Sequence, residues 1–91
     1  MISLKTAEEI EAIGRAGAII AELYDVLPKQ LQPGRSTGDL DRFAEEFIRS
    51  HEGAAPAFKG LYGFPATLCV SVNYEVVHGI PADRRRLAGG D

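Results

Sequence analysis

The spacing of apolar residues changes near Ala54, and this change restricts the chain to folds that combine helices with strands. In residues 10–27 and 40–48, apolar side chains recur at three- and four-residue steps, as they do along one face of an α-helix. Residues 67–72 instead alternate between apolar and small polar side chains, and a turn leads from them to a second β-branched run at 76–78. The sequence therefore predicts an α+β fold with two helices packed on an antiparallel sheet.

Both expected helices carry start signals. Thr6 and Glu9 form a capping-box pattern, and either hydroxyl of residues 36–37 can cap the second helix. Gly14 and Gly17 lie inside the first helix, where each costs roughly 1 kcal/mol relative to Ala. We therefore expect another part of the protein to pack closely against that face of the helix.

Composition limits the functional classes that the chain can belong to. The 91 residues suffice for one small domain, and 13 acidic against 10 basic residues give a formal net charge of -3. This charge argues against a general binder of nucleic acid or of membrane surfaces, which needs a basic face. The single Cys69 can form no internal disulfide, and no apolar run is long enough to span a bilayer. We expect a cytoplasmic protein without membrane contact.

Several other features have ordinary interpretations. The chain contains no GxGxxG, P-loop, HExxH or GxSxG pattern. His51, at the end of the second expected helix, is predicted to be solvent-exposed. The run Arg84-Arg85-Arg86 is typical of a solvated turn, because one triplet supplies few contacts to RNA phosphates. The terminal residues 87–91 read as a turn with no element after it, so we expect that the chain is cut there.

His78 is the strongest candidate for a functional side chain. It follows a β-branched run and precedes Gly79 and Pro81, which allow close approach of a ligand and stiffen the turn. A histidine at the end of a strand can also simply bond a nearby carbonyl, and spacing alone does not decide between the two roles. A soft thiol, Cys69, and three apolar side chains accompany it: Phe58, Leu61 and Phe64. Together they predict a pocket for an unbranched apolar side chain, with the imidazole directed at a polar backbone atom.

Three stretches give the chain a family resemblance. They are PGRSTGDLD at 33–41, GLYGFPATLCVSVNYEVVHGIP at 60–81 and the terminal GGD at 89–91. Across essentially its whole length, the chain resembles the N-terminal part of the type I methionine aminopeptidases. The resemblance implies the N-terminal half of the pita-bread fold, in which two pseudo-symmetric α+β halves enclose a dinuclear metal site. It also implies metal-dependent removal of the initiator methionine from nascent proteins when the next residue is small.

The resemblance further implies where the metal ions are held. In this family two divalent ions, of the Co, Mn, Fe, Zn or Ni type, are bound by Asp, His and Glu residues that lie further along the chain. Residues 1–91 are then one part of a single catalytic domain, cut before the first metal ligand. We expect them to bind no metal ion and to be inactive as an isolated chain. The expected partner is the N-terminus of a nascent polypeptide, with a ribosome contact left open and no direct contact with nucleic acid.

The resemblance also assigns roles to the pocket residues. His78 is similar to the family's substrate histidine, which hydrogen-bonds the scissile peptide, helps to stabilise the tetrahedral intermediate and is not a metal ligand. The walls of the pocket for the methionine side chain are implied to be Phe58, Leu61, Phe64 and Cys69, although Leu61 departs from the family's frequent Tyr. Two alternatives stay open: a non-catalytic pita-bread relative that binds ribosomes or nucleic acid, and a related Xaa-Pro aminopeptidase.

Overall fold

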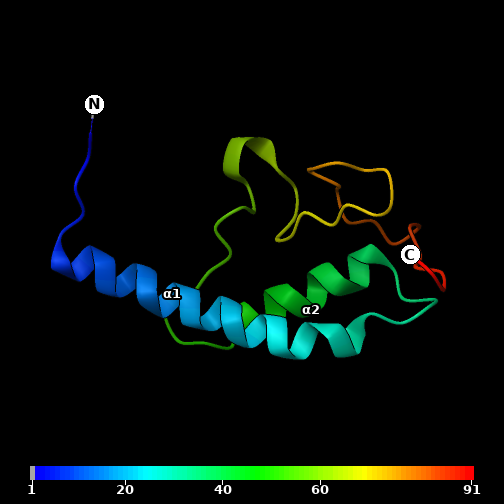
Figure 1. Ribbon diagram of the computed structural model, residues 1–91, viewed down its shortest axis with the longest axis horizontal. Helices are drawn as coiled ribbons and strands as arrows, with labels where there is room; N and C mark the ends of the chain where they lie inside the picture. Colours follow the sequence, from blue (N-terminus) through cyan, green and yellow to red (C-terminus); the bar gives the residue numbers. More distant parts are fainter. Residues whose placement is uncertain (1) are drawn as a thin grey trace.

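The computed structural model describes residues 2–91, and the regular structure of this part of the chain is helical. α1 (Ala7–Val26) continues into the 3-10 helix η1 (Leu27–Gln30), and α2 (Thr37–Arg49) runs back beside the C-terminal part of α1 (Figure 1). The chain then follows an irregular path beside α2, interrupted by a short 3-10 turn, η2 (Leu61–Gly63). α2 is therefore the element that both α1 and the irregular segment contact.

The helix start signals predicted from the sequence are confirmed. The Thr6 hydroxyl accepts the N–H of Glu9 at 3.1 Å, and the Glu9 carboxylate accepts the N–H of Thr6 at 2.8 Å. At α2 the Ser36 hydroxyl accepts the N–H of Asp39 at 3.0 Å, and Asp39 accepts the N–H of Ser36 at 2.9 Å. Each pair satisfies amide groups that a helix leaves without intrahelical partners.

The predicted antiparallel sheet is not formed by residues 2–91, which contain a single isolated antiparallel bridge between Ser36 and Arg86. The segments at 67–72 and 76–78 were expected to pair as a hairpin, but no backbone hydrogen bond joins these two segments. The nearest one runs from the N–H of Val70 to the carbonyl of Gly79, just after the second segment, at 2.9 Å. Asn73 and His78 adopt φ values of 57° and 58°, which interrupt an extended backbone. A lone two-stranded hairpin is also only marginally stable, because further strands or a helix must cover it.

The described part of the chain buries few apolar side chains. They are Leu23, Leu40, Ala44, Ala66 and Val72. The radius of gyration is 15.0 Å, whereas a compact domain of this length has about 12 Å. The accessible surface is 6813 Å², against about 5,200 Å² for a folded monomer of this mass. The fold is therefore open, with a large apolar surface left in contact with water.

Much of that surface lies on α1. Ile10 is 61% and Tyr24 is 69% exposed, although both belong to the apolar face of the helix. No atom lies within 4 Å of the position that a Cβ would take at Gly14 or Gly17. The expected close packing against these glycines is therefore absent among residues 2–91. The apolar spacing of α1 predicts the helix correctly, but the neighbour that would cover it is not supplied by these residues.

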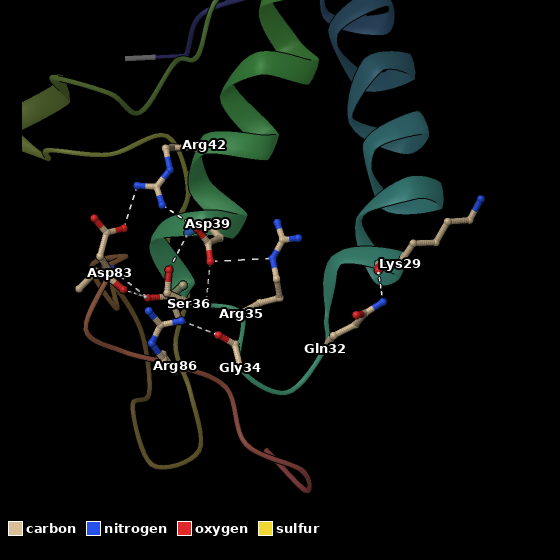
Figure 2. Close-up of polar contacts among 11 residues, drawn as sticks. Lys29, Gln32, Gly34, Arg35, Ser36, Asp39, Arg42, Asp83 and Arg86 are labelled. Carbon is tan, nitrogen blue, oxygen red and sulfur yellow. Dashed lines mark hydrogen bonds and ion pairs between the residues drawn. The ribbon is translucent and has the colours of Figure 1, made fainter.

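A turn at residues 82–86 docks on the start of α2. The Thr37 hydroxyl, which is almost completely buried, accepts the N–H of Ala82 at 2.8 Å and donates to its carbonyl at 3.3 Å. Figure 2 shows further polar contacts at this end of α2: the Arg42 guanidinium bonds Asp39 at 2.6 Å and Asp83 at 2.8 Å. These contacts fix the chain after His78 on α2.

Candidate functional site

All five predicted site residues line one pocket of about 460 Å³. The pocket is bordered by Phe58, Leu61, Tyr62, Gly63, Phe64, Pro65, Cys69, His78 and Ile80. Its walls come from three separate stretches of the chain, around η2, around Cys69 and around His78. The structure thus brings together residues that are up to 20 positions apart in the sequence.

The apolar wall of the pocket is a tight loop around η2. The N–H of Gly60 bonds the carbonyl of Phe64 at 2.7 Å, and the N–H of Phe64 bonds the carbonyl of Leu61 at 2.9 Å. Gly60 takes a φ of 85°, a value that side chains rarely adopt, so glycine suits this position. Phe58 and Leu61 remain 52% and 49% exposed. The loop therefore presents apolar surface that a ligand can still cover.

His78 belongs to the pocket lining and lies on a strained piece of backbone. Its φ of 58° is unusual for a residue with a side chain, and Gly79 after it is buried against the backbone of Val70 and Ser71. The His78 side chain is exposed, and its ring makes no hydrogen bond to any residue from 2 to 91. The ordinary role of bonding a nearby carbonyl is therefore not observed, and both ring nitrogens can contact a ligand.

The wall around Cys69 depends on two acidic residues of α2, Asp41 and Glu45. Asp41 Oδ1 accepts the N–H groups of Thr67 at 2.9 Å and of Leu68 at 2.7 Å. Glu45 Oε1 accepts from Lys59 Nζ at 2.6 Å and from the Thr67 hydroxyl at 3.3 Å. No local spacing rule connects a helical acid to backbone groups 26 residues away, so the sequence carries no signal for these contacts.

The charge around Glu45 also has an electrostatic consequence. The Lys59 ammonium and, to a lesser extent, the Arg49 guanidinium lower the pKa of the Glu45 carboxyl, because both favour its ionised form. Arg49 contacts the other oxygen of this carboxylate at 2.9 Å. Glu45 is therefore held as an anion between the loop that carries Phe58 and the segment that carries Cys69.

His51 is not the solvent-exposed side chain that was predicted. Its Nδ1 lies 2.9 Å from the carbonyl of Phe47, and its Nε2 lies 3.1 Å from Oε2 of Glu22 on α1. The Phe47 carbonyl and then the Glu22 carboxylate raise the pKa of His51, because both accept from the protonated ring. The prediction was wrong because a spacing rule within one helix does not reveal that another helix crosses its end.

Residues 2–91 contain no group of three or more His, Cys, Asp or Glu side chains that could hold a metal ion. In the pocket only Cys69 and His78 belong to these ligand types, and this donor set does not fit a dinuclear metal centre. A separate search of the same residues finds no helix that is both long and apolar enough to cross a membrane. Among the described residues, the pocket is thus lined mainly by apolar side chains, with one thiol and one imidazole.

Comparison with known proteins identifies the family of the chain that forms this pocket. Residues 11–91 match the model of metallopeptidase family M24, and the chain belongs to that family. Chemistry with metal ions is the defining feature of a metallopeptidase family.

Among its relatives are methionine aminopeptidases. The one from Clostridium perfringens is 54% identical over 81 residues, which cover 89% of this chain and 32% of the relative. The one from Clostridium acetobutylicum is 50% identical over 91 residues, or 100% of this chain and 36% of the relative. The resemblance inferred from the sequence motifs is thus confirmed, and the chain spans about a third of the length of these relatives.

The fold agrees with a solved structure. The crystal structure of methionine aminopeptidase from Rickettsia prowazekii superposes with a TM-score of 0.90 at 36% identity, covering 100% of this chain and 36% of that chain. The helices and the irregular segment of residues 2–91 therefore have the arrangement found in part of that structure.

Proposed function

We propose that the chain forms the substrate-pocket part of a methionine aminopeptidase, which removes the initiator methionine from nascent proteins by metal-dependent hydrolysis. The observation that carries this proposal is the gathering of His78 and four apolar or soft side chains around one open pocket, in a member of a metallopeptidase family. The high identity to proteins called methionine aminopeptidases supports the choice of substrate.

The pocket suits the methionine side chain for physical reasons. Phe58 and Phe64 offer ring surfaces to a thioether, a contact worth about 0.3–1.5 kcal/mol. Covering the half-exposed walls removes apolar surface from water, and full burial of a methionine side chain contributes about 1.5–3 kcal/mol. A thioether has no branch and bends easily, so it can fill the irregular space between Leu61 and Cys69.

His78 is proposed to contact the peptide bond that is broken. Because the ring makes no hydrogen bond to residues 2–91, it can donate to the carbonyl oxygen of that peptide from the pocket lining. A donor in this place binds more strongly as negative charge develops on the oxygen, and so lowers the barrier to hydrolysis. Two divalent metal ions would supply an activated water, and the side chains of residues 2–91 form no group that would hold them.

The same proposal extends to the fold of the complete domain, to the substrate and to its location in the cell. The chain would form the N-terminal half of a pita-bread fold, and the remainder of the catalytic domain would cover the apolar face of α1 and hold the metal ions. The substrate would be a nascent chain that begins with Met and a small second residue, in the cytoplasm. A contact with the ribosome is not required by any residue of the pocket.

A chimera tests the proposal directly. Residues 1–91 replace the matching N-terminal segment of the methionine aminopeptidase from Clostridium acetobutylicum, which aligns with this chain along its whole length. We expect the chimera, supplied with Co²⁺ or Mn²⁺, to release Met from a Met-Ala-Ser peptide. The 91-residue chain alone, under the same conditions, should release none.

The two histidines provide a matched pair of variants. His78→Ala in the chimera should lower kcat about 100- to 1000-fold, as expected for loss of a donor to the developing oxyanion. His51→Gln, at a residue that does not line the pocket, should keep kcat within a few fold. Equal effects of both changes would contradict the role of His78. A folded but inactive wild-type chimera would instead favour the non-catalytic, partner-binding alternative.

A further inference from the structure

We propose that Asp41 is a positioning residue that sets the wall of the substrate pocket around Cys69; this inference rests on the proposed function. Asp41 lies in the first half of α2, and one of its carboxylate oxygens accepts two consecutive backbone N–H groups, those of Thr67 and Leu68. These amides come directly before Cys69, which lines the pocket. Asp41 itself does not line the pocket, so it acts through the backbone.

The contact of Asp41 with the Thr67 and Leu68 amides matters because residues 2–91 supply no neighbouring strand for this segment. Amide groups shielded from water need hydrogen-bond partners, and an extended segment normally finds them in a neighbouring strand. Residues 2–91 contain no strand, and Thr67 is only 6% exposed. Asp41 therefore takes the place of a strand partner for these two amides. Bonds of this type to an ionised acceptor are about twice as strong as neutral ones.

Glu45 makes similar contacts to the part of the pocket wall around Phe58. It follows Asp41 by four positions, so the two carboxylates project from one face of α2. Glu45 binds Lys59, the residue after Phe58, and also the Thr67 hydroxyl. One helix face thus holds the loop that carries Phe58 and the segment that carries Cys69. The separation of the two walls, and with it the fit of the substrate side chain, is set by α2.

Amide hydrogen exchange of the 91-residue chain tests the contact without any activity measurement. In the wild type, the Thr67 and Leu68 amides should be protected. Asp41→Ala should speed their exchange about tenfold or more, whereas Asp41→Asn keeps an acceptor oxygen and should retain part of the protection. Glu46→Ala, a change on the exposed face of α2, serves as the control. Unprotected amides in the wild type, or equal exchange in all variants, would overturn the proposal.

Kinetics of the chimera then test the consequence for the substrate. Contacts that bind the substrate side chain equally well in the ground state and in the transition state affect KM rather than kcat. Asp41→Ala should raise KM for Met-Ala-Ser about tenfold, with kcat within about twofold, and Asp41→Asn should recover much of the loss. A fall in kcat at unchanged KM would point to a loss of folded protein and would overturn the positioning role.

Different results would contradict the proposed function and the positioning role of Asp41. A folded wild-type chimera without activity would contradict the proposed function. The exchange rates of the Thr67 and Leu68 amides would still show whether Asp41 holds the wall of the pocket. An active chimera in which the Asp41→Ala and Glu46→Ala variants have the same KM removes the positioning role and leaves the proposed function in place.

Discussion

Gly79→Ala is predicted to destabilise the folded chain, because Gly79 has the closest contacts to other backbone atoms among the glycines. A Cβ at this position would overlap the carbonyl group of Val70 and would lie 2.9 Å from the Cα of Ser71. All of these are backbone atoms, so no side-chain rotation relieves the overlap. The segment that carries His78 must therefore move away from residues 70–71.

The cost can be worked out from the contacts that such a movement breaks. The N–H of Val70 bonds the carbonyl of Gly79 at 2.9 Å, and the N–H of Gly79 bonds the Ser71 hydroxyl at 3.1 Å. Each lost hydrogen bond costs about 1 kcal/mol, and residual overpacking adds about 1–3 kcal/mol. The sum is about 3–5 kcal/mol, whereas a domain of this length has about 5–14 kcal/mol of stability in total.

Urea unfolding followed by far-UV circular dichroism measures this loss, and Gly89→Ala is the matched control. Nothing lies within 4 Å of a Cβ at Gly89, and its φ is not in the left-handed region. The control should therefore change the free energy of unfolding by less than about 0.5 kcal/mol. If Gly79→Ala also costs less than about 1 kcal/mol, the close approach of Gly79 to Val70 is not a feature of the folded chain.

Three further predictions concern stability. Gly14→Ala should stabilise the chain by about 1 kcal/mol, because α1 is open at this position; a lower Tm would mean that something does pack there. The N–H of Ser36 and then the Arg42 guanidinium lower the pKa of Asp39 from 3.8 to about 2. The contribution of the ionised Asp39 carboxylate to the free energy of unfolding is therefore complete above pH 3.8 and is lost as the pH falls toward 2. Acid unfolding of Asp39→Asn should be correspondingly less steep over that range. The pKa of His51 is raised above 6.5, so its bridge to Glu22 is complete below pH 6.5 and is lost as the pH rises through the folded value. His51→Gln should remove this pH dependence from urea midpoints measured on both sides of neutrality.

The parts of the fold that the sequence predicts best are those with local causes. The two helix starts depend on Thr6 with Glu9 and on Ser36 with Asp39, pairs only three residues apart. Their hydrogen bonds form within one turn and need no other part of the chain. The apolar spacing of α2 also places Leu40 in the core correctly. Local rules suffice wherever both partners of a contact lie in one element.

The pocket was predicted by a different route. Composition and spacing pointed to His78 and Cys69 but left the ordinary role of the histidine equally open. The neighbouring apolar residues Phe58, Leu61 and Phe64 suggested the walls, and the family resemblance assigned these walls to a methionine side chain; all five residues do border one pocket. The left-handed backbone of His78 was not foreseen, because it is set by the burial of Gly79 against a segment eight residues earlier.

The absent sheet and the unforeseen acidic contacts have one physical origin. Alternation in residues 67–72 indicates an extended backbone, but it does not supply the neighbouring strand that a ladder requires. The shielded amides still need partners, so Asp41 accepts two of them and the carbonyl of Gly79 accepts a third. The sequence pattern predicts the hydrogen bonds of a sheet. It does not reveal the contacts of Asp41 and Gly79 that take the place of those bonds. The wall of the pocket then depends on individual groups, so we expect a substitution at Asp41 or Gly79 to change the pocket more than one on the exposed face of α1.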